Sequence, residues 1–376
     1  MNWVSAEEAL ERLGVRRQTL YAYVSRGLLR ARPDEDDPRR SLYALGDLTQ
    51  LKGRRRGARR RAEVAAGAIA WGEPVLESAI STVRDGRLIL RGRPVEDLAA
   101  RATLEEVASL LWSSAGQPAP APAQKPDGAT AKARAFRVLA RHAAEDAPSL
   151  GRSASALAED AWRLLPAFAD ALAGASGSGP VHARLARAWK TSARGAQLIR
   201  RAVVLMADHE LNPSTFAVRI AASTGAPLAA CALAGMSTLA GPLHGEAAAR
   251  ALAQIDLLLA AKAPAAELKA MVARGENFAG WSHPLYPDGD PRAANLLAAL
   301  KPRAPMLRIL NLISRETGER PNCDAALAAL TRELGLPDDA PFCIFALGRL
   351  TGWLAHAIEQ RANGRIIRPR ARYVGE

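Results

Sequence analysis

The sequence has 376 residues, of which 49% are hydrophobic and 5% aromatic, and its formal net charge is +13 at pH 7. This length suffices to bury one large hydrophobic core or two domains. Alanine and leucine recur throughout, and they suit closely packed helices because alanine costs no side-chain entropy. No long run of alternating β-branched residues occurs, which argues against an extensive sheet. We therefore expect an all-α fold.

The cysteines and the apolar segments bound the cellular context. The cysteines form neither a CxxC pair nor a metal-ligand spacing, and their odd number is typical of a reducing compartment. The first ten residues, MNWVSAEEAL, are acidic where a signal peptide would be apolar. The most apolar window, at 226–243, contains two prolines and predicts a buried helix that ends in a loop. We expect a cytoplasmic protein with no membrane association. The cysteines are Cys231, Cys323 and Cys343.

The first segment, 1–52, predicts a small module. Ser5 and Glu8 form the pattern of a capping box ahead of a helix, and Gly14 ends that helix. A second helix follows at about 16–25, and then a charged, hairpin-like stretch. The stretch LGVRRQTLYAYVSRGLL and the wing after it resemble the MerR and excisionase-like winged helix-turn-helix modules, whose second helix enters the DNA major groove.

This resemblance implies possible DNA contacts from the second helix, although modules of this type also dock proteins. The stretch 1–61 holds 15 basic and 8 acidic residues, which favours a polyanion. A solvated arginine run is the alternative. The basic linker and connecting helix expected at 53–79 could hold phosphates or act as a flexible joint. The candidate DNA-contacting residues are Arg16, Arg17, Gln18, Thr19 and Tyr23.

From 80 to 376 the chain predicts one helical body. Thr103 and Glu106 form a second capping-box pattern, and 117–128 and 174–180 are expected to be loops between helices.

The six histidines fall into two groups. We expect His142 and His182 at the surface and His356 in the core, where it lies among apolar helical residues. The other three stand among glycine and proline, which fix irregular backbone and let a ligand come close. No HxH or HExxH spacing occurs, so we expect no bound metal. These three are His209 in HELNPSTF, His244 in GPLHG and His283 in GWSHPLYPDGDPR.

Taken in order, these segments closely resemble citrate synthase. The resemblance covers about 80–376, and further matches are PNCD, FALGRLTGWLAHAIEQ and RIIRPRARYVG. It implies the citrate synthase fold, with a large and a small helical domain, the small one at approximately 246–340. It also implies an acyl-CoA thioester and oxaloacetate as substrates, and no permanently bound cofactor.

The resemblance assigns the chemistry residue by residue. Asp324 is the base that removes a proton beside the thioester carbonyl, His244 stabilises the resulting enol, and His283 polarises the ketone of oxaloacetate. Oxaloacetate carries two carboxylates, which arginine side chains bind through paired, charge-assisted hydrogen bonds. The matching oxaloacetate ligands are His209, Arg292, Arg349 and Arg368, the last reaching across a homodimer interface.

The chain departs from the family pattern near the expected CoA contacts. Pro284 and Pro287 stand where typical members carry basic residues, and Glu246 stands where glycine is usual. Ala325 and Ala326 replace an aromatic pair after the base, which motivates the hypothesis that propionyl-CoA is also accepted. Cys323 has no base placed beside it, so we expect it to be unreactive.

Three interpretations follow. The first is an active synthase that carries a regulatory or docking module. The second is a DNA-binding regulator that uses the synthase body as a metabolite sensor. The complete set of catalytic residues favours the synthase. The third, a 2-methylcitrate synthase, differs in the acyl chain alone, and the sequence does not separate it.

Overall fold

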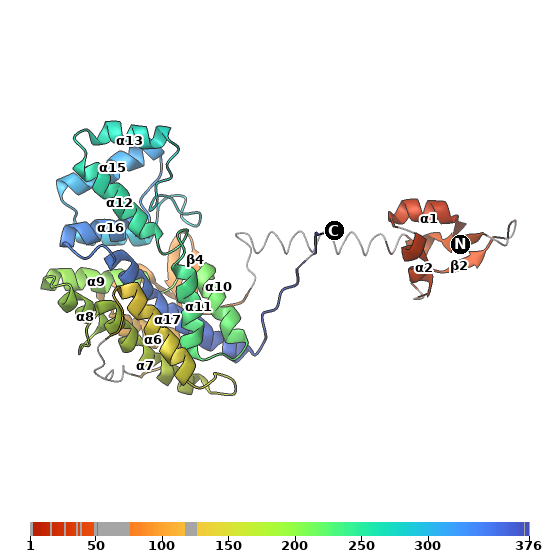
Figure 1. Ribbon diagram of the computed structural model, residues 1–376, viewed down its shortest axis with the longest axis horizontal. Helices are drawn as coiled ribbons and strands as arrows, with labels where there is room; N and C mark the ends of the chain where they lie inside the picture. The colour runs from red at the N-terminus through yellow and green to blue at the C-terminus, as the bar shows by residue number, and fades with distance from the viewer. Residues whose placement is uncertain are drawn as a thin grey trace. The chain divides into compact units, whose positions relative to one another are not determined.

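A computed structural model describes residues 3–15, 17–25, 28–34, 37, 40–48, 51, 76–116, 126–371 and 373–375. The chain divides into two compact units, residues 1–77 and 78–376, which are described separately (Figure 1). Most of the predicted linker, 53–79, and most of the predicted loop at 117–128 lie outside the described residues.

The N-terminal unit combines two helices with a small sheet. Ser5 caps the first helix by accepting a hydrogen bond from the Glu8 backbone N–H at 3.2 Å. Gly14 ends it in the left-handed conformation (φ 59°), where a residue without Cβ is favoured. Three antiparallel strands pair in the order β1-β3-β2. The elements are β1 Trp3–Val4, α1 Ala6–Leu13, α2 Arg17–Ser25, β2 Ala31–Pro33 and β3 Ser41–Ala44.

The second unit, called the body below, opens with a short antiparallel sheet. Its first two strands are joined by a two-residue turn at Asp85 (φ 51°) and Gly86 (φ 70°), the positive-φ pair that a tight hairpin requires. The strands are β4 Ser81–Arg84, β5 Arg87–Leu90 and β6 Arg93–Pro94.

Helices make up the rest of the body. The predicted capping box at Thr103 and Glu106 is confirmed, with both reciprocal hydrogen bonds present. One group of helices includes the long C-terminal helix: α4 Val95–Arg101, α5 Leu104–Trp112, α6 Ala131–Glu145, α7 Ala154–Ala173, α8 Val181–Ala188, α9 Ala193–Leu205, α10 Pro213–Ser223, α11 Leu228–Leu239 and α17 Ala340–Asn363. The remaining helices gather at one end of the body (Figure 1): α12 Ala247–Ala260, α13 Pro264–Ala273, α14 Pro291–Leu300, α15 Ala304–Thr317 and α16 Cys323–Leu334.

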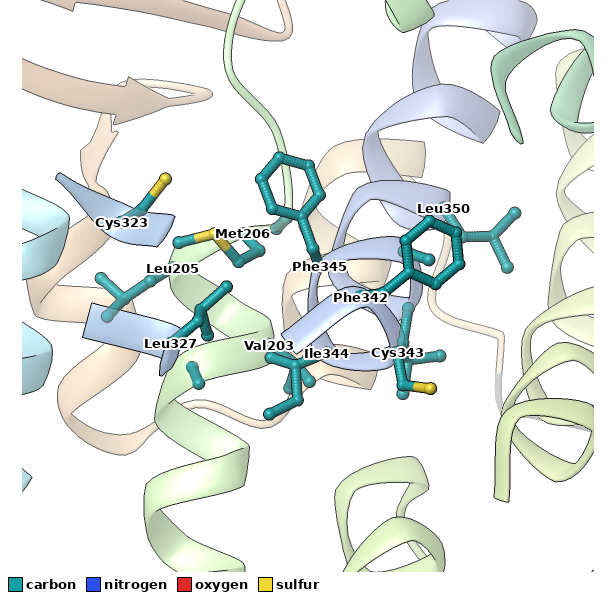
Figure 2. Packing of buried hydrophobic residues seen from close by; sticks show 14 of the residues in the cluster. Val203, Leu205, Met206, Cys323, Leu327, Phe342, Cys343, Ile344, Phe345 and Leu350 are labelled. Atoms are coloured by element: carbon teal, nitrogen blue, oxygen red, sulfur yellow. The ribbon is translucent and has the colours of Figure 1, made fainter. Parts of the chain in front are cut away.

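Helix α17 forms the centre of the body. Among the described residues, it is the helix long and apolar enough to cross a membrane, and its apolar window is wholly buried within the body. Figure 2 shows its N-terminal half packed against the end of α9 and the start of α16. The predicted apolar window at 226–243 forms α11, which is largely buried as expected.

Two glycines let α17 approach the end of α9. A Cβ atom at Gly348 would lie 2.8 Å from the Met206 Cβ, and one at Gly352 would overlap Asp208 Oδ1. The Gly352 backbone N–H also donates to the Ala207 carbonyl at 3.0 Å. The helix is therefore held directly against the segment that leads into His209.

The histidines outside the loops differ in part from expectation. His356 is fully buried, as predicted, and His142 is half-buried and 3.5 Å from Asp146. The prediction that His182 lies at the surface is wrong. It is 6% exposed because α8 turns this residue into the body, and burial lowers its pKa to about 4.

Candidate active site

His244 lies in the turn after α11. Its Nε2 is 2.9 Å from the Ser214 hydroxyl, which also accepts a hydrogen bond from the Trp353 indole at 3.2 Å. Burial and then the positive charge of Arg349 lower the pKa of His244 to about 4. The imidazole is therefore neutral at pH 7, and its one N–H can be offered as a hydrogen-bond donor.

His283 is held by the loop between α13 and α14. Gly280 (φ 89°) precedes it at a point where a Cβ atom would lie 2.8 Å from the Ala325 backbone nitrogen, so the loop presses against the start of α16. Ser282 adopts φ 65°, an uncommon conformation for a residue with a side chain. The Asn322 amide donates to the Ser282 carbonyl at 2.8 Å and ties the loop to α16.

The hydrogen bonding of His283 determines which ring nitrogen carries the proton. The Leu285 backbone N–H donates to Nδ1 at 3.2 Å, so the proton of a neutral ring is on Nε2. Burial, together with the charges of Arg292 and Arg349, lowers the pKa of His283 to about 4. This histidine is also a neutral hydrogen-bond donor at pH 7.

His209 forms an aromatic cluster with His283 and Tyr286. The two imidazole centroids are 5.0 Å apart in an edge arrangement, and Tyr286 lies 5.0 Å from His283. The Tyr286 hydroxyl is 2.9 Å from His209 Nε2. Burial, followed by the charges of Arg292 and Arg349, lowers the pKa of His209 well below its ordinary value.

Arg292 is pinned at the start of α14. Asp290 caps this helix and accepts hydrogen bonds from the Arg292 Nε at 3.0 Å and Nη2 at 2.8 Å, a bidentate pair. The same carboxylate accepts from the Cys323 backbone N–H at 3.0 Å, which joins α14 to α16. Burial alone would lower the pKa of Arg292, but Asp290 raises it above the ordinary value. Its guanidinium also lies over the Tyr286 ring.

Arg349 enters the site from α17. It is 1% exposed, and its Nε donates to the Met206 carbonyl at 3.1 Å. Burial lowers its pKa to about 10, so the guanidinium remains charged at pH 7. Among the described residues no carboxylate forms an ion pair with Arg349. A buried cation without an ion partner favours an anionic ligand.

Asp324 is the second residue of α16. The Asn322 side chain caps the helix by accepting from the Asp324 backbone N–H at 2.8 Å. The Oδ1 of Asp324 is buried and has no hydrogen-bond partner. Burial raises the pKa of Asp324 to about 6 against the lowering effect of Arg292 and Arg349. A carboxylate poised in this way is suited to act as a base near neutral pH.

The structure brings six of the seven predicted residues of this site together. The His209 and His283 rings are in contact, and His244 and Arg349 both lie against Phe345. The positive charge of Arg349 lowers the pKa of His209, His244, His283 and Asp324. The positive charge of Arg292 lowers the pKa of three of these four groups: His209, His283 and Asp324. The seventh, Arg368, is exposed on the segment that follows α17 and leaves the helical body (Figure 1). No hydrogen bond or ion pair among the described residues joins it to the other six.

Two members of the site were missed in the sequence. Tyr286 touches both histidines of the cluster, and Asp290 holds Arg292. The signal for Asp290 was available, since aspartate before Pro-Arg at a helix start is a capping pattern. Tyr286 had no such signal, because its role depends on the fold of the loop.

The residues that depart from the family pattern have defined surroundings. Pro284 and Pro287 are exposed. Glu246 pairs with Lys132 of α6, so its negative charge is balanced. Ala325 and Ala326 are fully buried. Burial raises the pKa of the Cys323 thiol far above its ordinary value, in agreement with the expectation that it is unreactive.

A separate cavity of about 790 Å³ borders this region. It lies between α14 and α15, and Asp290 is a site residue on its wall. None of the three site histidines lines it. Within the described ranges, no group of three or more His, Cys, Asp or Glu side chains could hold a metal ion.

The candidate DNA-contacting residues of α2 differ in exposure. Arg17 and Gln18 are exposed and Thr19 is half-buried, while Arg16 lies outside the described residues. Tyr23, the last of the candidate DNA contacts, is half-buried. It packs against the small core of the unit, because it lies three residues after the buried Leu20 on the same helix face.

The comparisons with known proteins concern the family and the fold of this chain. The sequence profile described as "Citrate synthase, C-terminal domain" matches residues 69–370. Citrate synthase 2 of Bacillus subtilis is 34% identical over 189 residues, which cover 48% of this chain and 51% of the relative. Citrate synthase of Haloferax volcanii is 38% identical over 192 residues, with 48% and 51% covered. The 2-methylcitrate synthase of Shewanella oneidensis is 34% identical, with 49% and 52% covered. The chain thus spans about half the length of the curated relatives that it matches.

Solved structures extend the similarity over most of the body. The citrate synthase of Thermotoga maritima superposes with a TM-score of 0.67 at 26% identity, covering 81% of this chain and 94% of that one. A ternary complex of carboxymethyl coenzyme A and oxaloacetate with the citrate synthase of Thermoplasma acidophilum gives a TM-score of 0.65 at 23% identity, over the same shares of the two chains. The expected all-α citrate synthase fold of the body is confirmed. On its matched sequence profile and its fold, this chain belongs to the citrate synthase family.

Proposed function

We propose that the body condenses acetyl-CoA with oxaloacetate and releases citrate and free CoA. The observation that carries this proposal is the Asp324 carboxylate, whose buried Oδ1 has no partner and whose pKa is raised to about 6. Such a group can take a proton at neutral pH without being held in an ion pair. The complex with oxaloacetate and a CoA analogue described for the Thermoplasma acidophilum enzyme supports the choice of substrates.

In the first step, Asp324 removes a proton from the carbon beside the thioester carbonyl. The oxygen gains negative charge as the enol forms, and a hydrogen bond from the neutral His244 stabilises it. Neutral imidazole is the appropriate donor, because its low pKa leaves the ring uncharged before and after the step. A buried site lets this single hydrogen bond act without competition from water.

In the second step, the enol carbon attacks the ketone carbon of oxaloacetate. His283 Nε2–H polarises the ketone oxygen, since its Nδ1 is occupied by the Leu285 N–H. Arg292 and Arg349 hold the carboxylates of oxaloacetate, together with His209. Water then hydrolyses the citryl thioester. No permanently bound cofactor takes part, and CoA enters as a substrate.

An assay of thiol release tests the reaction and also decides which acyl-CoA is preferred. The small side chains of Ala325 and Ala326 leave more space beside Asp324 than an aromatic pair would, so propionyl-CoA is a second candidate substrate. The similarity to a 2-methylcitrate synthase supports this choice. Thiol release is measured with each acyl-CoA and oxaloacetate. Wild type should release thiol from acetyl-CoA, and propionyl-CoA turnover no better than background would remove the second substrate.

Asp324→Asn should reduce thiol release by at least about a hundredfold, the lower end of the effect of one acid–base group. Asp338→Asn is the matched control, because Asp338 is an exposed carboxylate paired with Arg332 outside the site. If the wild type binds oxaloacetate but releases no thiol from either acyl-CoA, the result would instead favour the interpretation as a metabolite-sensing regulator.

The domain organisation is part of the proposal. We take α12–α16 as the small domain, in line with the expected range 246–340, and the remaining helices of the body as the large domain. We also propose that the protein acts as a homodimer in which Arg368 of each protomer completes the site of the other. The exposed position of Arg368 on the C-terminal segment supports this assignment.

For the N-terminal unit we propose a winged helix-turn-helix that contacts DNA through α2. Two helices with a three-stranded sheet and a separate core support this assignment, as do the exposed Arg17 and Gln18. Full-length protein should bind duplex DNA with an affinity that falls as salt rises. Arg17→Ala should weaken this binding, whereas Glu7→Ala on α1 should not. Equal binding by wild type and both variants would discard the contact.

A further inference from the structure

A buried row of polar side chains lies behind His209. Asp208 precedes His209 in the chain and is fully buried. Its Oδ2 accepts a hydrogen bond from the Ser81 hydroxyl at 2.5 Å and lies 3.2 Å from His356 Nε2. Its Oδ1 has no hydrogen-bond partner. A buried carboxylate with one unsatisfied oxygen costs free energy, which calls for an explanation beyond packing.

The hydrogen bonds of His356 determine its protonation. Arg219 Nε is always a donor, and it lies 3.0 Å from His356 Nδ1. Nδ1 is therefore unprotonated, and the neutral ring carries its proton on Nε2, which donates to Asp208. Arg219 is itself held by the Gln360 side-chain oxygen at 3.0 Å and by an ion pair with Glu359. His356 is thus fixed from both sides.

These buried polar side chains extend to Arg349, which we propose binds a carboxylate of oxaloacetate. Arg349 lies two helical turns before His356 on the same face of α17, because residues seven apart on a helix share a face. Burial lowers the pKa of Arg349, and the negative charge of Asp208 is the strongest influence that opposes this. Yet no ion pair joins Asp208 to Arg349 among the described residues. The Asp208 carboxylate thus offsets part of the positive charge of Arg349 without pairing with it. The Arg349 guanidinium can therefore bind an anionic ligand.

We propose that His356 is a positioning residue for the oxaloacetate end of the site, since it keeps the Asp208 carboxylate from pairing with Arg349. The ligand named here rests on the proposed function. Without His356, the carboxylate loses a hydrogen bond and turns toward the guanidinium, where it competes with a substrate carboxylate. The expected consequence is weaker binding of oxaloacetate, with no effect on acyl-CoA.

The test compares His356→Leu with His356→Gln. A glutamine amide can accept from Arg219 and donate to Asp208, whereas leucine can do neither. The KM for oxaloacetate should rise at least about tenfold in the leucine variant, the effect of losing a hydrogen bond to a charged group, and should be largely restored in the glutamine variant. The KM for acetyl-CoA should not change in either. His182→Leu is the matched control, since His182 is also buried but lies on α8 outside the site.

Two results would overturn the proposal. One is a leucine variant that keeps the wild-type KM for oxaloacetate, whatever its thermal stability. The other is a glutamine variant no better than leucine. If the leucine variant does not fold, Ser81→Ala removes the other hydrogen bond to Asp208 Oδ2, and its KM for oxaloacetate should rise as well.

Calorimetric binding of oxaloacetate separates this inference from the proposed reaction. A wild type that binds oxaloacetate but releases no thiol would refute the reaction, while a Kd raised in the leucine variant and restored by glutamine would still support positioning. A Kd that is unchanged in the leucine variant would refute positioning whether or not thiol is released.

Discussion

Replacing Asp324 by asparagine should stabilise the protein above neutral pH while it removes activity. Burial raises the pKa of Asp324 from 3.8 to about 6, so the folded protein holds the ionised form against a free-energy cost. At 1.36 kcal/mol for each pKa unit, this rise corresponds to about 3 kcal/mol. Asparagine has nearly the same shape and no charge to desolvate, so most of this cost should disappear.

The sign of the pH dependence follows from the direction of the shift. Below about pH 3 the carboxyl is protonated in the folded and the unfolded states, and both variants should have similar free energies of unfolding. As the pH rises toward 6, the unfolded chain ionises first and the wild type loses relative stability. Above the folded-state pKa the difference should level off at about 3 kcal/mol in favour of Asp324→Asn.

Urea denaturation of both variants at pH 5, 6.5 and 8 measures this difference, with Asp338→Asn as the control. The same pKa predicts the activity profile, because only the ionised carboxylate can act as a base. The kcat/KM for thiol release should fall about tenfold per pH unit below pH 6. Equal free energies of unfolding at pH 8, or full activity maintained at pH 5, would refute the assignment of a buried, unpaired base.

Three further outcomes are expected. Gly352→Ala should lower the free energy of unfolding by about 1–3 kcal/mol in urea denaturation, because its Cβ would overlap Asp208 Oδ1; an unchanged midpoint would contradict the close approach of α17. Inactive Asp324→Asn and Arg368→Ala protomers, mixed and allowed to exchange, should recover about a quarter of wild-type thiol release. Half of the dimers are then hybrids, and each hybrid has one complete site of two. No recovery would argue against a shared site. Tyr286→Phe removes the hydroxyl 2.9 Å from His209 and should raise the KM for oxaloacetate about five- to tenfold, whereas an unchanged KM would leave the ring as a packing element alone.

Local signals were enough to predict much of the secondary structure, whereas the candidate site residues came from the resemblance to citrate synthase. The caps at Ser5 and Thr103 were read from side-chain chemistry that acts within one helical turn, and the structure contains both. The apolar stretch that forms α11 was recognised because its composition alone excludes exposure. Glycine and proline around His244 and His283 marked them as loop residues, and both do lie in irregular segments.

The sequence by itself thus predicted the helix caps from local side-chain chemistry, and its resemblance to citrate synthase supplied the candidate site residues. Their environment was decided by tertiary packing. The packing of α17 against the end of α9 buries Arg349 and Asp208, and the His283 loop packs against the start of α16, where Asp324 Oδ1 has no partner. Burial is a property of everything that surrounds a group, so pKa values, the role of Tyr286 and the inward position of His182 depend on residues far away in the chain.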